Sequence, residues 1–306
     1  MGEPAIRVRG VEKRYGAVEA VRGIDLDVAE GELFALLGPN GAGKTTTVEI
    51  LEGHRERTSG DVSVLGMDPA TAGRELRDRI GIVLQTSGIE PELTVTEAID
   101  LYGSCYRQRR PAAELLELVG LEEKADARIG SLSGGQRRRI DLALGIVGRP
   151  DMLFLDEPTT GFDAAARRRS WNVVGELCGQ GATVLLTTHY LDEAERLANR
   201  VGVLAGGRLV AEGTPDELVA GIGGTVVSFA LPPGVAVTDL PDLGSPPVVD
   251  GGRVELATDS PTADLHHLTG WAMERGIALD DLRVVRPTLE DAFLQLSVPE
   301  RVEDDG

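Results

Sequence analysis

The sequence predicts an α/β protein with a mainly parallel sheet, followed by a small α+β domain. Three observations support this prediction. Over residues 1–222, five short apolar runs alternate with segments of helical periodicity, as in chains whose strands and helices alternate. These runs are apolar at consecutive positions, which is typical of strands buried on both faces of a sheet. From about residue 223, after several glycines, strands with alternating apolar and polar residues follow.

The elements can be placed in order. Strands are expected at 32–38, 79–85, 151–158, 182–189 and 200–213, with helices between them, for instance at 44–52 and 191–200. Later strands are expected at 225–231, 253–259 and 279–285, and later helices at 262–276 and 287–296. Thr288 and Asp291 have the spacing of a capping box. We therefore expect a first domain at 1–222 with a helical subdomain at about 88–148, an accessory α+β domain at 223–300 and a tail at 301–306.

Composition restricts the partners. The formal net charge is −19, and residues 225–306 hold 15 acidic and five basic side chains, so no nucleic-acid partner is expected, because phosphate binding needs a basic surface. Cys105 and Cys178 have neither metal-ligand spacing nor a disulfide pattern, which indicates a reducing cytosol. The apolar runs are much shorter than the roughly 20 residues that span a bilayer. Work at a membrane would therefore need a partner chain.

A glycine-rich loop follows the first buried strand and opens a helix. Residues 38–45 read GPNGAGKT, which fits the G-x-x-x-x-G-K-[ST] pattern of a phosphate-binding loop. Glycines let backbone N–H groups approach a polyphosphate closely. We expect Lys44 to reach the β- and γ-phosphates and Thr45 to offer its hydroxyl to Mg²⁺. The residues expected to bind nucleotide here are Gly38, Asn40, Gly41, Gly43, Lys44, Thr45 and Thr46.

Acidic residues end a later buried strand, MLFLDE at 152–157. An unpaired carboxylate there would be costly, so holding Mg²⁺ is a natural role for Asp156. Glu157 comes next and can act as general base toward an attacking water. His189 ends another strand on the same rim, where open α/β sheets bind ligands. It is interpreted as a γ-phosphate contact rather than a structural histidine.

A second candidate phosphate-binding helix start is LSGGQ at 132–136, with Ser133, Gly134, Gly135 and Gln136 at the helix N-terminus. With GPNGAGKT before it and FLDEP after it, residues 1–222 resemble the ATP-binding cassette (ABC) ATPases. The resemblance implies a P-loop NTPase cassette with a mainly parallel core, an antiparallel β edge and a helical subdomain. It implies ATP and Mg²⁺ as ligands.

The same resemblance implies further roles. Tyr15 matches the aromatic residue that stacks on adenine, and Gln85 the glutamine that reaches Mg²⁺ and the attacking water. Asp163 matches the loop that links two sites across a dimer, and His189 the histidine switch. In the family, the second cradle closes on the γ-phosphate held by another subunit. Because this chain has one copy of each half, a homodimer that forms with ATP is expected.

Several segments resemble ATPases of daunorubicin-resistance-type exporters, including the closing PTLEDAFLQL at 287–296. The resemblance implies an ATP-hydrolysing exporter subunit at the cytoplasmic face of a bacterial cell membrane, driving a separately encoded polytopic permease that docks near residues 86–107. Drug, lipid and polysaccharide cargo stay open, an importer is a nearer alternative, and a soluble ABC ATPase a more distant one. The accessory domain is interpreted as a dimerising or regulatory module. The arginine run at 137–139 is interpreted as a solvated helix face.

Overall fold

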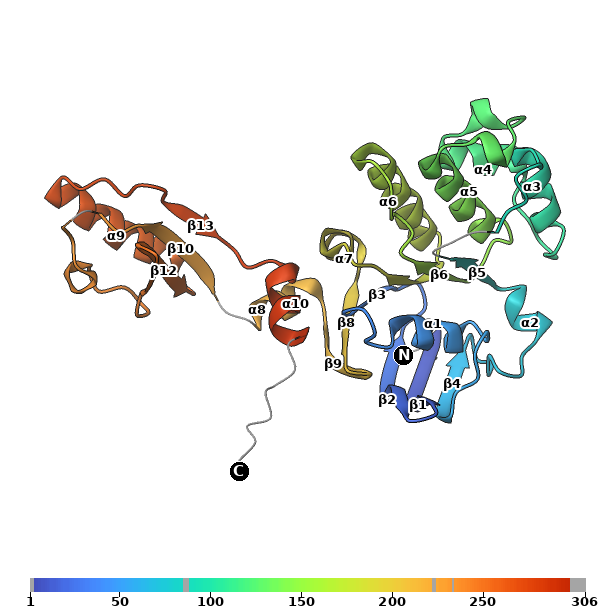
Figure 1. Cartoon of the computed structure of the whole chain (residues 1–306), viewed down its shortest axis with the longest axis horizontal. Coiled ribbons are helices and arrows are strands. Elements are labelled where there is room, and N and C mark those ends of the chain that lie inside the picture. Colours follow the sequence, from blue (N-terminus) through green and yellow to red (C-terminus); the bar gives the residue numbers. More distant parts are fainter. Residues whose placement is uncertain (1–2, 85–87, 222–223, 233, 298–306) are drawn as a thin grey trace. The chain divides into compact units, whose positions relative to one another are not determined.

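The computed structural model describes residues 3–84, 88–221, 224–232 and 234–297. The chain forms two compact units. The first consists of Met1–Pro215 and the C-terminal segment from Leu296, and the second of Asp216–Gln295. The first unit contains two sheets and most of the helices, and the second unit contains one further sheet (Figure 1).

The core of the first unit is a six-stranded sheet in the order β5-β6-β7-β3-β8-β9. All neighbouring pairs are parallel except β8 and β9. Every residue of β3 and β7 is buried, which confirms the expectation drawn from consecutive apolar residues. The strands are β3 (Leu33–Leu37), β5 (Ile80–Val83), β6 (Met152–Asp156), β7 (Thr183–Thr187), β8 (Arg200–Ala205) and β9 (Arg208–Gly213).

This sheet separates two apolar cores. Along β6, Leu153 and Leu155 pack into one core with the helical insertion, and Met152 and Phe154 pack into the other. The alternation follows from the strand period of two. A strand apolar at every position therefore serves both faces.

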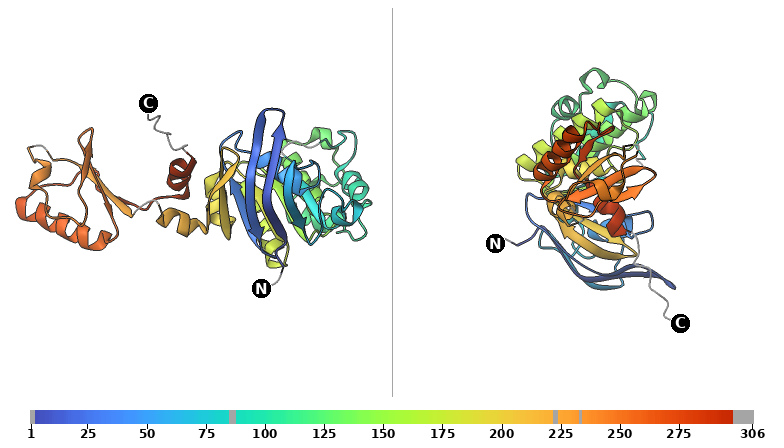
Figure 2. Two further views of the ribbon diagram at one scale, coloured as in Figure 1. Left: turned by 90° about the horizontal axis from the view of Figure 1, so that it is seen from below. Right: turned by 90° about the vertical axis from the view of Figure 1, so that its left-hand side faces the viewer.

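A second, antiparallel sheet in the order β2-β1-β4 covers the other core (Figure 2). Its strands are β1 (Ile6–Tyr15), β2 (Val18–Val28) and β4 (Ser59–Val64). Their burial alternates because one face is solvated. An antiparallel β layer is thus present, as the resemblance implied.

The helices cover the sheets and form the insertion. The helices of the first unit are α1 (Lys44–Leu51), α2 (Arg74–Arg77), α3 (Val95–Gly103), α4 (Ala112–Val119), α5 (Gly134–Ile146), α6 (Ala164–Gly179) and α7 (Leu191–Leu197). The helix expected over 191–200 ends at Leu197, because Ala198 is extended and Arg200 already begins β8. In the described part of the chain, no helix is both long and apolar enough to cross a membrane.

The second unit packs α9 (Pro261–Arg275) against a sheet in the order β11-β12-β10-β13. Phe229, Leu256 and Trp271 belong to its core. The capping box is confirmed, since the Thr288 N–H donates to Asp291 Oδ2 (2.8 Å) and the Asp291 N–H to Thr288 Oγ1 (3.4 Å). The remaining elements are α8 (Pro215–Ala220), β10 (Thr225–Ala230), β11 (Val248–Asp250), β12 (Arg253–Thr258), β13 (Arg283–Val285) and α10 (Leu289–Ser297).

Candidate functional site

The loop between β3 and α1 lies too close to its neighbours for side chains at two positions. A Cβ on Gly38 would lie 2.5 Å from the main-chain oxygen of Leu204, and a Cβ on Gly43 2.5 Å from that of Ala20. Gly43 also has a φ of 102°, which favours glycine. The fold itself therefore requires glycine at both ends of the loop, and a bare backbone is presented at the start of α1.

Lys44 is held by this same loop. Its Nζ donates to the carbonyl oxygens of Gly38 (2.6 Å) and Pro39 (3.2 Å). Burial lowers the pKa of the ammonium group, and the nearby carboxylates of Glu157 and Asp156 oppose that shift. The side chain is therefore folded back over the loop at the helix N-terminus, where an anion would find both the ammonium and free N–H groups.

A cavity of about 320 Å³ opens beside this loop. The structure brings most residues of the first expected site to its wall, together with Asp156, which ends β6, and Glu157, which follows it. Its lining consists of Ala20, Asn40, Gly41, Gly43, Lys44, Thr45, Thr46, Asp156 and Glu157. Three chain segments far apart in the sequence thus meet at one place, at the carboxyl ends of β3 and β6.

Asp156 and Glu157 have different surroundings. Thr187 donates a short hydrogen bond from its hydroxyl to the Asp156 carboxylate, and this fixes the carboxylate at the end of β6. Glu157 has a φ of 46°, in the left-handed region, which costs a non-glycine residue about 1–2 kcal/mol. Its N–H donates to the Thr187 carbonyl (2.9 Å). The backbone therefore turns sharply at Glu157.

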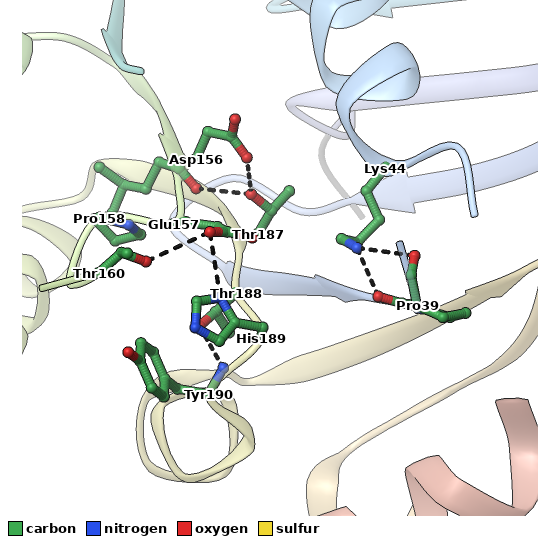
Figure 3. A network of polar contacts seen from close by, with 12 residues as sticks. Pro39, Lys44, Asp156, Glu157, Pro158, Thr160, Thr187, Thr188, His189 and Tyr190 are labelled. Carbon is green, nitrogen blue, oxygen red and sulfur yellow. Dashed lines mark hydrogen bonds and ion pairs between the residues drawn. The ribbon is translucent and has the colours of Figure 1, made fainter. Parts of the chain in front are cut away.

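The Glu157 side chain contacts residues from the next strand end. His189 Nδ1 lies 3.2 Å from Glu157 Oε2, and the Thr160 hydroxyl donates to the same oxygen at 3.4 Å (Figure 3). The His189 side chain is 47% exposed, whereas that of Glu157 is 17% exposed. His189 therefore occupies the rim, as the sequence predicted, with its imidazole against the carboxylate.

The second expected cradle starts α5 and is absent from the cavity lining given above. Ser133 caps this helix by accepting from the Gln136 N–H (3.3 Å), while Gln136 Oε1 accepts from the Ser133 N–H (2.9 Å). A Cβ on Gly134 or Gly135 would meet no described atom within 4 Å. The fold of this chain therefore gives no packing reason for those two glycines.

Three further residues lie outside the cavity lining or outside the described chain. Tyr15 ends β1, is 41% exposed, and has Lys13 Nζ and the Arg55 guanidinium 5.1 Å and 5.3 Å from its ring centroid. Asp163 caps α6 by accepting from the Ala166 N–H (2.7 Å). Gln85 lies outside the described residues.

The interpretation of the run 137–139 as a solvated face is wrong for Arg138. This side chain is only 7% exposed and donates to main-chain oxygens around the end of β6. Arg139, half-buried, donates to the Val119 and Gly120 oxygens at 2.9 Å each. Only Arg137 is exposed. The sequence signal that could have identified the burial of Arg138, though not its contacts, is its helical spacing, because it is three positions from the buried Asp141 and four from the buried Leu142.

A phosphate-binding loop, an acidic strand end and a histidine beside it on one α/β sheet define a P-loop ATPase. Residues 21–160 match the ABC transporter family, and residues 225–288 match the C-terminal domain of ABC transporter domain-containing-like proteins. The daunorubicin resistance ATP-binding protein DrrA3 of Streptomyces coeruleorubidus is 41% identical over 314 residues, with 98% of each chain covered. The Nod factor export ATP-binding protein I of Paraburkholderia xenovorans is 43% identical over 308 residues, with 97% of this chain and 98% of the relative covered. The chain therefore belongs to the ATP-binding proteins of ABC transporters.

Solved structures agree with this assignment. An ATP-binding subunit of an ABC transporter superposes with a TM-score of 0.66 at 28% identity, covering 71% of this chain and 93% of that one. A dimeric ATP-binding cassette in a post-hydrolysis state, bound to ADP and Pi, superposes with a TM-score of 0.63 at 26% identity, covering 68% of this chain and 98% of that one. The chain binds and hydrolyses ATP as the ATP-binding subunit of a transporter.

Proposed function

We propose that this chain powers an exporter as an ATP-dependent homodimer at the cytoplasmic face of a bacterial cell membrane, working on a separately encoded polytopic permease. The observation that supports this best is the division of the candidate site. The phosphate-binding loop and the acidic residues line a single cavity. The start of α5 is absent from that lining, and its two glycines, Gly134 and Gly135, have open space beside them. Two copies related by a two-fold axis would complete both sites at once.

In the proposed reaction, the loop at 38–43 and Thr46 cradle the phosphates and Tyr15 stacks on the adenine. Glu157 takes a proton from the attacking water as general base. Lys44 and His189 stabilise the charge that develops on the γ-phosphoryl oxygens. The contact between His189 and Glu157 supports this assignment, because each side chain holds the other at the rim of the cavity.

The residues present also fit a magnesium ion. Mg²⁺ prefers oxygen ligands and keeps several waters, so one carboxylate and one hydroxyl suffice from the protein. Thr45 and Asp156 line the same cavity, and Gln85 is proposed as a further ligand from the family pattern. Among the described residues, no cluster of three or more histidine, cysteine or acidic side chains suits a metal, which is compatible with such a sparse site. Bound there, Mg²⁺ would neutralise phosphate charge.

The proposed dimer uses the bare helix start at α5. Ser133 keeps its hydroxyl proton free to donate, because its oxygen only accepts within the cap. Gly134, Gly135 and Gln136 would approach the partner's γ-phosphate, and Asp163 would link the two sites. The open space at both glycines supports this, since a polyphosphate from outside the chain would fill it. The dimeric state of the superposable ADP-bound cassette supports it too.

The proposed docking place for the permease is a second pocket of about 210 Å³ beside β5. It lies between the end of that strand, α3 and α5, next to residues 85–87 in the sequence. Its lining consists of Ile82, Val83, Leu84, Gly88, Ile89, Tyr102, Asp141 and Leu144. An apolar wall with a tyrosine and a carboxylate suits a short helical segment of another protein.

The relatives suggest two classes of cargo. One relative is a daunorubicin resistance protein and another a Nod factor export protein, so we propose export of a drug-like compound first and of a Nod-factor-like compound second. A pull-down from detergent-solubilised native membranes would test the exporter assignment. A stoichiometric polytopic membrane protein is expected, and recovery of only non-membrane partners would contradict it.

The dimer and the catalytic role of Glu157 are tested together with Glu157→Gln protein, sized with and without ATP. The variant should hydrolyse ATP orders of magnitude more slowly, bind it nearly normally, and run as a dimer with ATP only. Glu56→Gln, at an exposed position after α1, is the matched control and should behave as the wild type. A Glu157→Gln monomer in saturating ATP would count against the dimer. For the accessory module, a chain ending at residue 224 should lose part of its dimerisation or regulation.

A further inference from the structure

Arg138, on α5, joins the ends of two strands. Its guanidinium donates to the main-chain oxygens of Asp156 (2.9 Å), Glu157 (2.7 Å) and Pro158 (3.1 Å), and makes a short hydrogen bond to that of Leu84. Leu84 follows β5 directly, whereas the other three residues end β6 and begin the loop beyond it. One planar side chain therefore holds four carbonyl groups from two segments 70 residues or so apart in the chain.

Such a side chain is costly to keep in place. Burying a cation away from water is unfavourable unless it is paired or fully hydrogen-bonded. The carboxylate of Asp141 lies 3.8 Å from Arg138 Nη1, longer than a direct charge-assisted hydrogen bond. Burial lowers the pKa of the guanidinium. The carbonyl contacts and the charges of Asp141, Asp156 and Glu157 together compensate for its burial. Among these, only the carbonyl groups accept a direct hydrogen bond from the guanidinium in the contacts described above.

Those contacts lie where the backbone is strained. Glu157 has a left-handed φ of 46°, and a non-glycine residue stays in that region only when its surroundings fix it. Its N–H is fixed by the Thr187 oxygen and its own oxygen by Arg138. The carbonyls before and after it are also held by Arg138. The direction of the Glu157 side chain therefore depends on this guanidinium.

We propose that Arg138 is a positioning residue that holds Glu157 in its left-handed conformation, where Glu157 can take a proton from the water that attacks the γ-phosphate. We propose further that Arg138 transmits displacements in the pocket beside β5 to Glu157. The inference rests on the proposed function of Glu157. The relay follows from shared residues, because Leu84 and Asp141 both line that pocket and both contact Arg138. A segment seated in the pocket would displace one or both, and Arg138 would transmit the displacement to the backbone of Glu157.

The test uses the full-length chain with Arg138→Met, which keeps the length of the side chain and removes every donor. Arg137→Met, at the exposed position just before it, is the matched control. For Arg138→Met we expect kcat to fall about tenfold or more, with the Kd for ATP within about twofold of the wild type, since Arg138 is not among the residues lining the nucleotide cavity. A wild-type kcat, or an equal loss of kcat and ATP affinity, would overturn the proposal.

A second variant protects the test against misfolding. Arg138→Lys keeps the charge but cannot reach four carbonyls at once, so we expect an intermediate kcat at unchanged KM. A lysine variant as active as the wild type would overturn the multiple-carbonyl role even if the methionine variant fails to fold. Combined with Glu157→Gln, Arg138→Met should leave the ATP-dependent dimer intact, and loss of that dimer would also refute the inference.

The Glu157→Gln and Arg138→Met variants together distinguish the role of Glu157 from that of Arg138. If Glu157→Gln protein turns over ATP at the wild-type rate, the proposed role of Glu157 is wrong, and the positioning role falls with it. If Glu157→Gln is inactive while Arg138→Met is fully active, only the positioning role is wrong.

Discussion

Glu52, directly after α1, is a buried carboxyl group that lies against the imidazole of His54. The residue is 4% exposed, and His54 Nδ1 lies 3.2 Å from its Oε2. Burial, followed by the charges of Asp156 and Glu49, raises the pKa of Glu52 from 4.5 to about 8. The folded protein therefore binds a proton there that the unfolded chain releases at lower pH.

The raised pKa of Glu52 makes the folded protein less stable as pH rises. Between pH 4.5 and pH 8, the folded state holds more protons at Glu52 than the unfolded state, so this group makes the free energy of unfolding fall as pH rises. One pKa unit corresponds to about 1.4 kcal/mol. Glu52 therefore lowers the free energy of unfolding by less than about 1 kcal/mol near pH 5 and by on the order of 4 kcal/mol near pH 8. Glu52→Gln removes this effect while keeping the shape of the side chain.

Urea unfolding at several pH values between 5 and 8, without nucleotide, measures this difference. The two tryptophans lie in different units, Trp171 in the first and Trp271 in the second, so a Trp271→Phe background reports on the first unit alone. The advantage of Glu52→Gln should grow by about 3 kcal/mol from pH 5 to pH 8. Glu56→Gln should show no such trend. A Glu52→Gln curve parallel to the parent at every pH would refute the reasoning.

Three further predictions concern the site. Gly43→Ala should abolish ATP binding, because its Cβ would lie 2.5 Å from a main-chain oxygen of β2; Gly175→Ala, in open space on α6, should bind normally and unfold at a slightly higher temperature. Thr187→Val removes the hydroxyl that donates to Asp156, so a Mg²⁺ titration of ATPase activity should show a several-fold higher requirement for the ion, and an unchanged titration would contradict the link. Ser133→Ala removes the side-chain cap of α5, so the free energy of unfolding should fall by about 1 kcal/mol. In a Glu157→Gln background it should also weaken the ATP-dependent dimer, and a dimer as strong as before would argue against a role of this hydroxyl.

The sequence predicted the parallel core and the cavity well because local signals were sufficient there. Consecutive apolar residues identified β3 and β7, and the spacing of the glycines with Lys44 identified the loop. The close contacts of Gly38 with Leu204 in β8 and of Gly43 with Ala20 in β2 became visible only in the structure. The strands β1, β2 and β4 were not placed one by one, since only alternate residues are buried and the segments also carry many charges.

The role of Arg138 could not be read from the sequence. A run of three arginines is usually solvated, and what distinguishes the middle one is contact with residues about 20 and 54 positions away. Such contacts depend on the packing of α5 against β5 and β6, which no local pattern records. The short helix α7 was overextended for a similar reason, because pairing of Arg200 with β3 ends it early.

The strand order also determines when, during synthesis on the ribosome, the central strand β3 can pair. Strand β3 pairs only with β7 and β8 in the six-stranded sheet, and Leu33 meets Val184 about 150 residues later in the chain. At about 5–20 residues per second, a ribosome needs about 8–30 s between them. For that time the apolar β3 has no sheet partner, and the wall of the nucleotide cavity is unfinished. A nascent chain of this protein should thus gain ATP affinity only after both neighbours of β3, which end at Ala205, have emerged from the ribosome.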